Sequence, residues 1–303
     1  MPLSAAHSPS IFEPLRRRHL LWFVALGALA VAFRHTLIGM VKLSLSTDHY
    51  SHIAVIPFLT GFLLYWHRNK IFSNAAPAVG LGAVVAVTAF PLLWFGWRAA
   101  SESDAYLFTN ALVLFVLVVA TFISCYGTGA FRAALFPLLL LFLAVPLPAN
   151  AVDVMIVFLQ RGSAAVCEAL FSLTGIPFFR EGLIFHFSKL TIEVARECSG
   201  IRSSIGLLVT TLLAVHILMR SWWKQAIVVA CVVPLVLLKN GVRIVTLTLL
   251  GGYVDPRFLT GWLHTSGGIV FYLFALAVIG ILIRMLEWNP ATAKTVASVR
   301  AAH

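Results

Sequence analysis

Long runs of apolar residues, separated by short polar segments, dominate the pattern of this chain. A helix that crosses a bilayer needs about 20 mostly apolar residues, and about eight runs reach or approach that length. The pattern therefore predicts an all-α polytopic membrane protein with about eight transmembrane helices. The expected spans are residues 20–40, 50–66, 78–97, 105–126, 131–148, 199–219, 225–250 and 262–283.

Composition supports this class. The 303 residues are 60% hydrophobic and only 11% charged, which is too few polar side chains to cover a folded surface in water. A soluble globular protein is therefore excluded. We expect a cytoplasmic N-terminal tail (1–19), a single transmembrane domain (20–284) and a cytoplasmic C-terminal tail (285–303).

Basic residues in the short loops predict the orientation. Under the positive-inside rule, cytoplasmic loops carry an excess of lysine and arginine. The segments that fit this side are Arg16–Arg18, "HRNK" at 67–70, "RSWWK" at 220–224 and Arg284. Both termini are then expected inside.

The longest segment between expected spans, 149–198, is predicted to be an extracytoplasmic insertion. Its first part, 150–175, has apolar residues at helical spacing interrupted by polar ones, which indicates a small amphipathic helix at the membrane interface. Its second part, 176–197, alternates apolar and polar residues and is rich in β-branched and aromatic types. That alternation predicts a β-hairpin.

The four cysteines do not suggest a disulfide framework. Cys198 stands apart, because it lies where the insertion meets an apolar run, between Arg196 and Arg202. Nearby cations and a helix N-terminus both favour the reactive thiolate. The stretch is equally compatible with a cysteine of no role at the solvent edge. The other three lie in apolar or amphipathic runs and are expected to be small buried hydrophobes: Cys125, Cys167 and Cys231.

Two further polar interruptions stand in apolar runs. In "LKNGVRIV", Lys239, Asn240 and Arg243 interrupt the span at 225–250, and charged residues at membrane depth usually face a polar cavity. Asn240 and Arg243 share a helix face if the helix continues. The alternative for Arg243 is an arginine that reaches the outer interface. In "GWLHTSGG", His264 opens the last span, as a base or as an interfacial anchor.

Alternating helices would place Cys198, Arg243 and His264 at the same outer level of the membrane. A thiol, a guanidinium and an imidazole at one depth match the parts of thiol-mediated acyl transfer, namely nucleophile, oxyanion stabiliser and general acid–base. His186, on the expected outer strand, is a second candidate for the base.

Three motifs in this order, "ECSGIRSS", "NGVR" and "LHTSGG", resemble the exosortase/archaeosortase family of membrane-embedded cysteine proteases and transpeptidases. "HYSHIAVIPFLTGFLLYW" at 49–66 is similar to an early family helix, although Ile53 stands where a glycine is often seen. The resemblance covers roughly residues 45–285.

This resemblance implies an enzyme that cleaves the C-terminal sorting signals of secreted proteins (PEP-CTERM-like: a short motif, a transmembrane helix and a basic tail). The cleavage would take place at the outer face of a bacterial or archaeal plasma membrane, in protein sorting linked to exopolysaccharide. Cys198 would be the nucleophile, Arg243 would stabilise the thioacyl transition state and His264 would shuttle protons. The expected partners are such secreted proteins and membrane lipid, without cofactor, metal or nucleic acid. Hypothetical substrate contacts are Arg196, Arg202 and Asn240.

Alternatives from other classes stay open. In a transporter or assembly component for polysaccharide or lipid-linked sugar, Arg243 and Lys239 would bind a lipid phosphate and Cys198 would be incidental. A structural membrane subunit would need none of these residues. The outer arginines would then pair with lipid headgroups or with Glu193 and Glu197.

Overall fold

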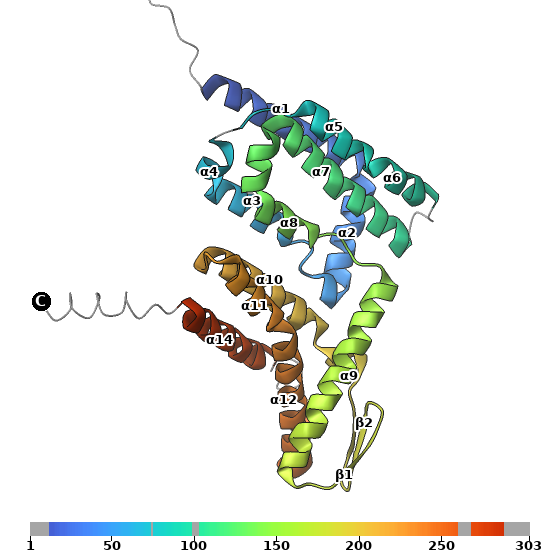
Figure 1. Cartoon of the computed structure of the whole chain (residues 1–303). Coiled ribbons are helices and arrows are strands. Elements are labelled where there is room, and N and C mark those ends of the chain that lie inside the picture. The colour runs from blue at the N-terminus through green and yellow to red at the C-terminus, as the bar shows by residue number, and fades with distance from the viewer. Residues whose placement is uncertain (1–11, 74, 99–102, 260–267, 288–303) are drawn as a thin grey trace, which may run out of the picture. The chain divides into compact units, whose positions relative to one another are not determined.

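The computed structural model describes residues 12–73, 75–98, 103–259 and 268–287, and most of them are helical (Figure 1). Within these ranges six helices are long and apolar enough to cross a membrane, or seven if one bent pair counts as a span. The all-α polytopic membrane class is therefore confirmed, with a slightly smaller count than eight. The chain divides into two compact units, Met1–Ala151 and Val152–His303, and each is described by itself.

The first unit contains eight α-helices and one short 3-10 helix among the described residues. They are α1 (Phe12–Ala32), α2 (Arg34–Ser46), η1 (Asp48–Tyr50), α3 (Ile56–Trp66), α4 (Arg68–Phe72), α5 (Val79–Val87), α6 (Ala89–Arg98), α7 (Asp104–Ala133) and α8 (Leu135–Phe142).

Two of the predicted spans are shorter helices than expected. The prediction of a span at 131–148 is wrong, since α8 has 8 residues and is therefore only about 12 Å long. The chain leaves the helical conformation at Ala134 before α8, with φ of −94° and ψ of 6°, and prolines follow α8 at 146 and 148. The span predicted at 50–66 contains only the 11 residues of α3.

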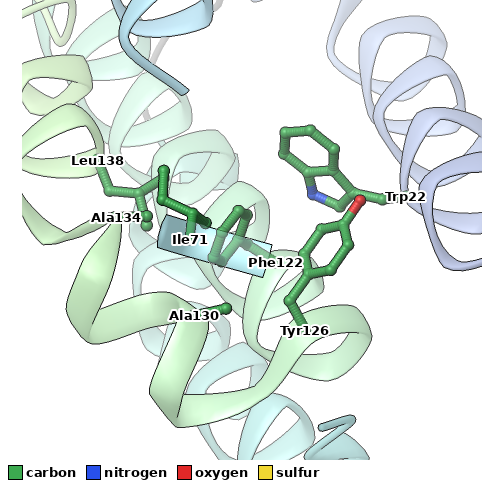
Figure 2. Close-up of a cluster of buried hydrophobic side chains, with 7 residues drawn as sticks. All are labelled: Trp22, Ile71, Phe122, Tyr126, Ala130, Ala134 and Leu138. Carbon is green, nitrogen blue, oxygen red and sulfur yellow. The ribbon is translucent and has the colours of Figure 1, made fainter. Parts of the chain in front are cut away.

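Aromatic side chains from α1 and α7 form the centre of the first unit's core (Figure 2). The ring of Trp22 meets Phe122 edge to face, with centroids 5.5 Å apart. Tyr126 is fully buried, and its hydroxyl lies 2.7 Å from Nδ1 of His19. A phenol that is buried with a hydrogen-bond partner fastens α1 to α7. The remaining buried members are Ile71, Ala130, Ala134 and Leu138.

The second unit combines long helices with a small sheet. Its elements are α9 (Ala149–Thr174), β1 (Phe178–Glu181), β2 (Ile184–Phe187), β3 (Thr191–Glu193), η2 (Arg196–Ser199), α10 (Ile201–Leu218), α11 (Trp222–Ala230), α12 (Val232–Tyr253), η3 (Pro256–Leu259) and α14 (Gly268–Glu287).

Helix α9 is longer and more apolar than the small interfacial helix that the sequence predicted. Its 26 residues are sufficient to cross a membrane by length and composition. It lies along α12 at two glycines, where a Cβ on Gly162 would stand 2.7 Å from Leu237 and one on Gly241 would stand 2.5 Å from Val166. Small residues allow helices to approach closely in membrane proteins.

The predicted β-hairpin is confirmed and gains a third strand. The strands pair antiparallel in the order β1-β2-β3, with Phe179 opposite His186 and Phe185 opposite Ile192. Phe185 is fully buried, and its ring packs at a tilt against that of Phe171 of α9, with centroids 5.5 Å apart. The sheet is thereby anchored on the helices, and its last strand leads the chain directly to Cys198.

Candidate functional site

Cys198 lies in a sharp turn between the sheet and a membrane helix. It belongs to the short helix η2 and is half-buried, and α10 begins three residues later. Gly200 joins the two helices with φ of 73°, a left-handed conformation that glycine adopts without the steric cost of a Cβ. This turn therefore presents the thiol at the N-terminal end of α10, where the helix dipole favours a thiolate.

Asn240 of α12 fastens this turn in place. Its side chain is only 1% exposed, and its Nδ2 donates to the carbonyl of Cys198 at 2.7 Å and to Oγ of Ser163 at 2.9 Å. One amide thus joins η2, α12 and α9. Gly200 is needed here as well, since a Cβ at that position would lie 3.1 Å from Oδ1 of Asn240.

Lys239, the preceding residue, holds the next part of the same segment. Its side chain is 4% exposed and its Nζ donates to Oγ of Ser203 at 2.5 Å. Ser203 in turn donates to the carbonyl of Gly200 at 2.9 Å. A buried ammonium is costly inside a membrane protein, and such groups usually mark functional positions. Two consecutive residues of α12 therefore hold the segment from Cys198 to Ser203.

Arg243 lies one turn beyond Asn240 on α12 and is half-buried. Residues three apart share a helix face, so its guanidinium belongs to the face that carries the Cys198 contact. His264 lies outside the described residues. The last helix, α14, begins at Gly268 and packs against α10, where the hydroxyls of Tyr272 and Thr210 are 3.0 Å apart.

The two arginines around Cys198 are both exposed. Arg196 pairs with Asp153 of α9 at 2.5 Å. Arg202 occupies the first turn of α10. Both lie within four residues of Cys198 along the chain. The spare base candidate, His186, lies on β2, where its Nδ1 is 3.3 Å from Oγ1 of Thr191 and its Nε2 is 3.9 Å from Glu181.

Sequence reasoning did not identify the polar residues of α9 that support this segment. Gln160 is 6% exposed and donates to the carbonyl of Val194 at 2.8 Å, close to the end of the sheet. Ser163 is fully buried and accepts from Asn240. The available signal was their spacing, because two polar residues three apart in an apolar helix share one face.

The described residues include no group of three histidine, cysteine, aspartate or glutamate side chains that could hold a metal ion. The side chains that the structure gathers around this turn are a thiol, cations and an amide. These features define a polytopic helical membrane protein with a cysteine turn secured by buried polar residues of a neighbouring helix.

Comparison with known proteins agrees with this class. The chain matches the family described as transmembrane exosortase over residues 44–281, most of its 303 residues. It therefore belongs to the transmembrane exosortase family, as the motifs at 45–285 suggested. No curated protein and no solved structure matches the chain.

Proposed function

We propose that the chain is a membrane cysteine peptidase or transpeptidase that cleaves C-terminal sorting signals of secreted proteins, with Cys198 as its nucleophile. The observation that carries the proposal is the Cys198 turn, which the amide of Asn240 holds at the start of α10. A nucleophile on a rigid support meets its substrate without first paying the entropy of ordering itself.

The proposed reaction has two stages. The Cys198 thiolate attacks the scissile carbonyl, and the new oxyanion is stabilised by the guanidinium of Arg243. His264 gives a proton to the leaving amine, so the peptide bond breaks and a thioester remains. Water or an amine then attacks the thioester and restores the thiol. Two observations support this role for Arg243. It is half-buried in a membrane helix, and it shares a helix face with Asn240.

The substrate we propose is a secreted protein with a short motif such as Pro-Glu-Pro, an apolar helix and a basic tail. A helix-anchored substrate is confined to the membrane plane, which raises the chance of encounter with a site at the membrane edge. The exposed guanidiniums of Arg196 and Arg202 suit the glutamate of such a motif. In this scheme the site opens to the extracytoplasmic side of a plasma membrane, and the products belong to exopolysaccharide-linked protein sorting.

We propose a positioning role, rather than substrate contact, for Asn240. Its side chain is 1% exposed and both of its donated hydrogen bonds end on protein atoms. The alternative of a transporter for lipid-linked sugar needs Lys239 to receive a phosphate. Lys239 is 4% exposed and its ammonium is bonded to Ser203, which favours the peptidase over the transporter.

The decisive experiment compares two cysteine substitutions in cells that co-express a reporter with a Pro-Glu-Pro motif, an apolar helix and a basic tail. Cys198→Ala is expected to leave the protein in the membrane while uncut reporter accumulates. Cys231→Ala, which changes a half-buried cysteine between α11 and α12, serves as the control and is expected to process normally. Processing that survives Cys198→Ala would overturn the nucleophile assignment.

A second experiment separates the alternative function. The transporter hypothesis predicts that Cys198→Ala is tolerated, whereas Arg243→Gln and Lys239→Met lose function.

A membrane-impermeant thiol reagent, added to intact cells, tests on which side of the membrane Cys198 lies. Cys198 is expected to be labelled without permeabilisation, and labelling only after permeabilisation would refute an outward-facing site.

A further inference from the structure

The first unit contains a large cavity whose lining residues all belong to that unit. Its volume is about 930 Å³, and its walls come from α1, α3, α4, α7 and α8. Pockets that bind small molecules usually span about 300 to 1,000 Å³. The cavity is therefore large enough for a substantial ligand.

One stripe of α1 forms a long apolar wall of this cavity. Leu15, His19, Trp22 and Leu26 all line it, and their spacing places them on one helix face. From Leu15 to Leu26 the helix rises about 16 Å. Apolar residues of the other helices complete the deeper part, including Leu141 of α8. The cavity is thus an elongated apolar slot.

Polar groups line the cavity beside the N-terminal half of α1. They are Arg68, Asn69 and Ser73, and the ring of their neighbour Phe72 lies 4.8 Å from that of His19. The guanidinium of Arg68 is exposed and is held over the ring of Tyr65, 4.3 Å from its centroid. A charge that is placed by an aromatic ring loses little entropy when a ligand binds.

The charge around this end is mainly positive. Residues 15–32 and 56–73 contain no aspartate or glutamate, and Glu13 is the one acidic residue of α1 before Leu15. Arg16 and Arg17 of α1 and Lys70 of α4 add exposed cations to Arg68. An apolar slot with a cationic end has the polarity of an anionic lipid, with its chains in the slot and its headgroup at the arginine.

We propose that this cavity is a binding site for an anionic phospholipid, whose phosphate meets Arg68 and whose acyl chain follows the α1 wall. The same cations repel a transmembrane helix with a basic end, which is the form of the substrate proposed above. The lipid site is independent of that proposal, since every residue of the cavity lies in the first unit.

Photolabelling of the purified full-length protein in nanodiscs tests this site. The probes are phosphatidylglycerol and phosphatidylcholine that carry a diazirine on one acyl chain, and mass spectrometry locates the labelled peptides. We expect the phosphatidylglycerol probe to label the α1 and α8 walls of the cavity more strongly than the phosphatidylcholine probe. One arginine near an anionic headgroup contributes a preference of about fivefold, and Arg68→Gln should remove it.

A matched pair of glycine substitutions supplies the control. Gly61 of α3 lines the cavity, and a Cβ there meets no atom within 4 Å, so Gly61→Phe fills the slot without a clash at the backbone. Gly27 of α1 has equally open space and does not line the cavity. We expect Gly61→Phe to abolish cavity labelling and Gly27→Phe to retain it. Equal labelling by both probes in the unaltered protein, or full labelling of Gly61→Phe, would show surface lipid only and overturn the proposal.

Discussion

Replacing Asn240 with alanine tests whether the cysteine turn depends on its anchor. The substitution removes two hydrogen bonds from a side chain that is 1% exposed, one to Oγ of Ser163 and one to the carbonyl of Cys198. The loss of each bond is expected to lower the free energy of unfolding by a different amount. A hydrogen bond between helices in a membrane protein averages about 0.6 kcal/mol. A carbonyl that loses its donor costs about 1–3 kcal/mol when it is buried, and the carbonyl of half-buried Cys198 belongs at the lower end of that range.

The expected loss of stability for Asn240→Ala is therefore about 2 kcal/mol. The expected loss of activity is larger, because a nucleophile displaced by about 1 Å can cost about 100-fold in rate. Ser163→Ala is the matched control, since it removes the weaker bond and keeps the contact with Cys198. It should cost about 0.6 kcal/mol.

The assay follows cleavage of a sorting-signal peptide by the purified protein in nanodiscs, with thermal unfolding measured in parallel. Asn240→Ala should lower kcat strongly and leave KM almost unchanged, at a temperature where both variants are folded. Alkylation of Cys198 by iodoacetamide gives a readout that does not depend on the substrate, and its rate should change only in Asn240→Ala. Equal kcat values for the two variants under those conditions would refute a positioning role for Asn240.

Three further predictions concern backbone strain, protonation and charge. Gly200→Ala should destabilise the protein by about 1–2 kcal/mol, because alanine is strained in the left-handed conformation. Its Cβ would also lie 3.1 Å from Oδ1 of Asn240, which adds a second cost. In denaturant unfolding the control Gly175→Ala should lack this second cost, because Gly175 has φ of 71° but no atom within 4 Å of an added Cβ. Burial, the largest cause, lowers the pKa of His52 below its ordinary 6.5. The unfolded chain therefore binds this proton more tightly than the folded protein does. The stability of the folded protein is then highest above about pH 6.5 and falls on acidification. Thermal melts between about pH 8 and pH 5 should show this slope, and His52→Gln should flatten it. Arg196→Ala should raise KM for an acidic sorting motif. Asp153→Ala should not raise KM, because it only frees the guanidinium from its ion pair at 2.5 Å. Equal increases in KM for the two variants would indicate that the ion pair is structural.

Much of the architecture follows from local sequence pattern. The apolar runs correctly predicted a helical membrane protein, since burying so many apolar residues requires a bilayer. The alternation of polar and apolar residues correctly predicted a hairpin within 176–197, and the structure gives its strands as Phe178–Glu181 and Ile184–Phe187. Hydropathy failed at 131–148, because it does not register the helix break at Ala134 or the prolines at 146 and 148, which leave α8 with 8 residues.

The candidate site divides in the same way. Cys198, Asn240 and Arg243 were selected as candidates from the sequence, because polar groups at the edges or in the middle of apolar runs are costly and therefore conspicuous. The hydrogen bonds that these residues make could not be predicted from the sequence. Asn240 was expected to contact substrate, whereas its amide is occupied by Ser163 and the Cys198 carbonyl.

The sequence by itself determined the membrane class of this protein, its family motifs and the short set of polar residues that chemistry could use. Those properties depend on neighbours along the chain, such as hydropathy over a helix length and the order of motifs. Only the tertiary structure decided that Asn240 holds a carbonyl 42 residues away and that Lys239 holds Ser203, 36 residues away. Such contacts arise when distant helices pack closely enough for buried donors to find acceptors, and that packing is a property of the whole fold.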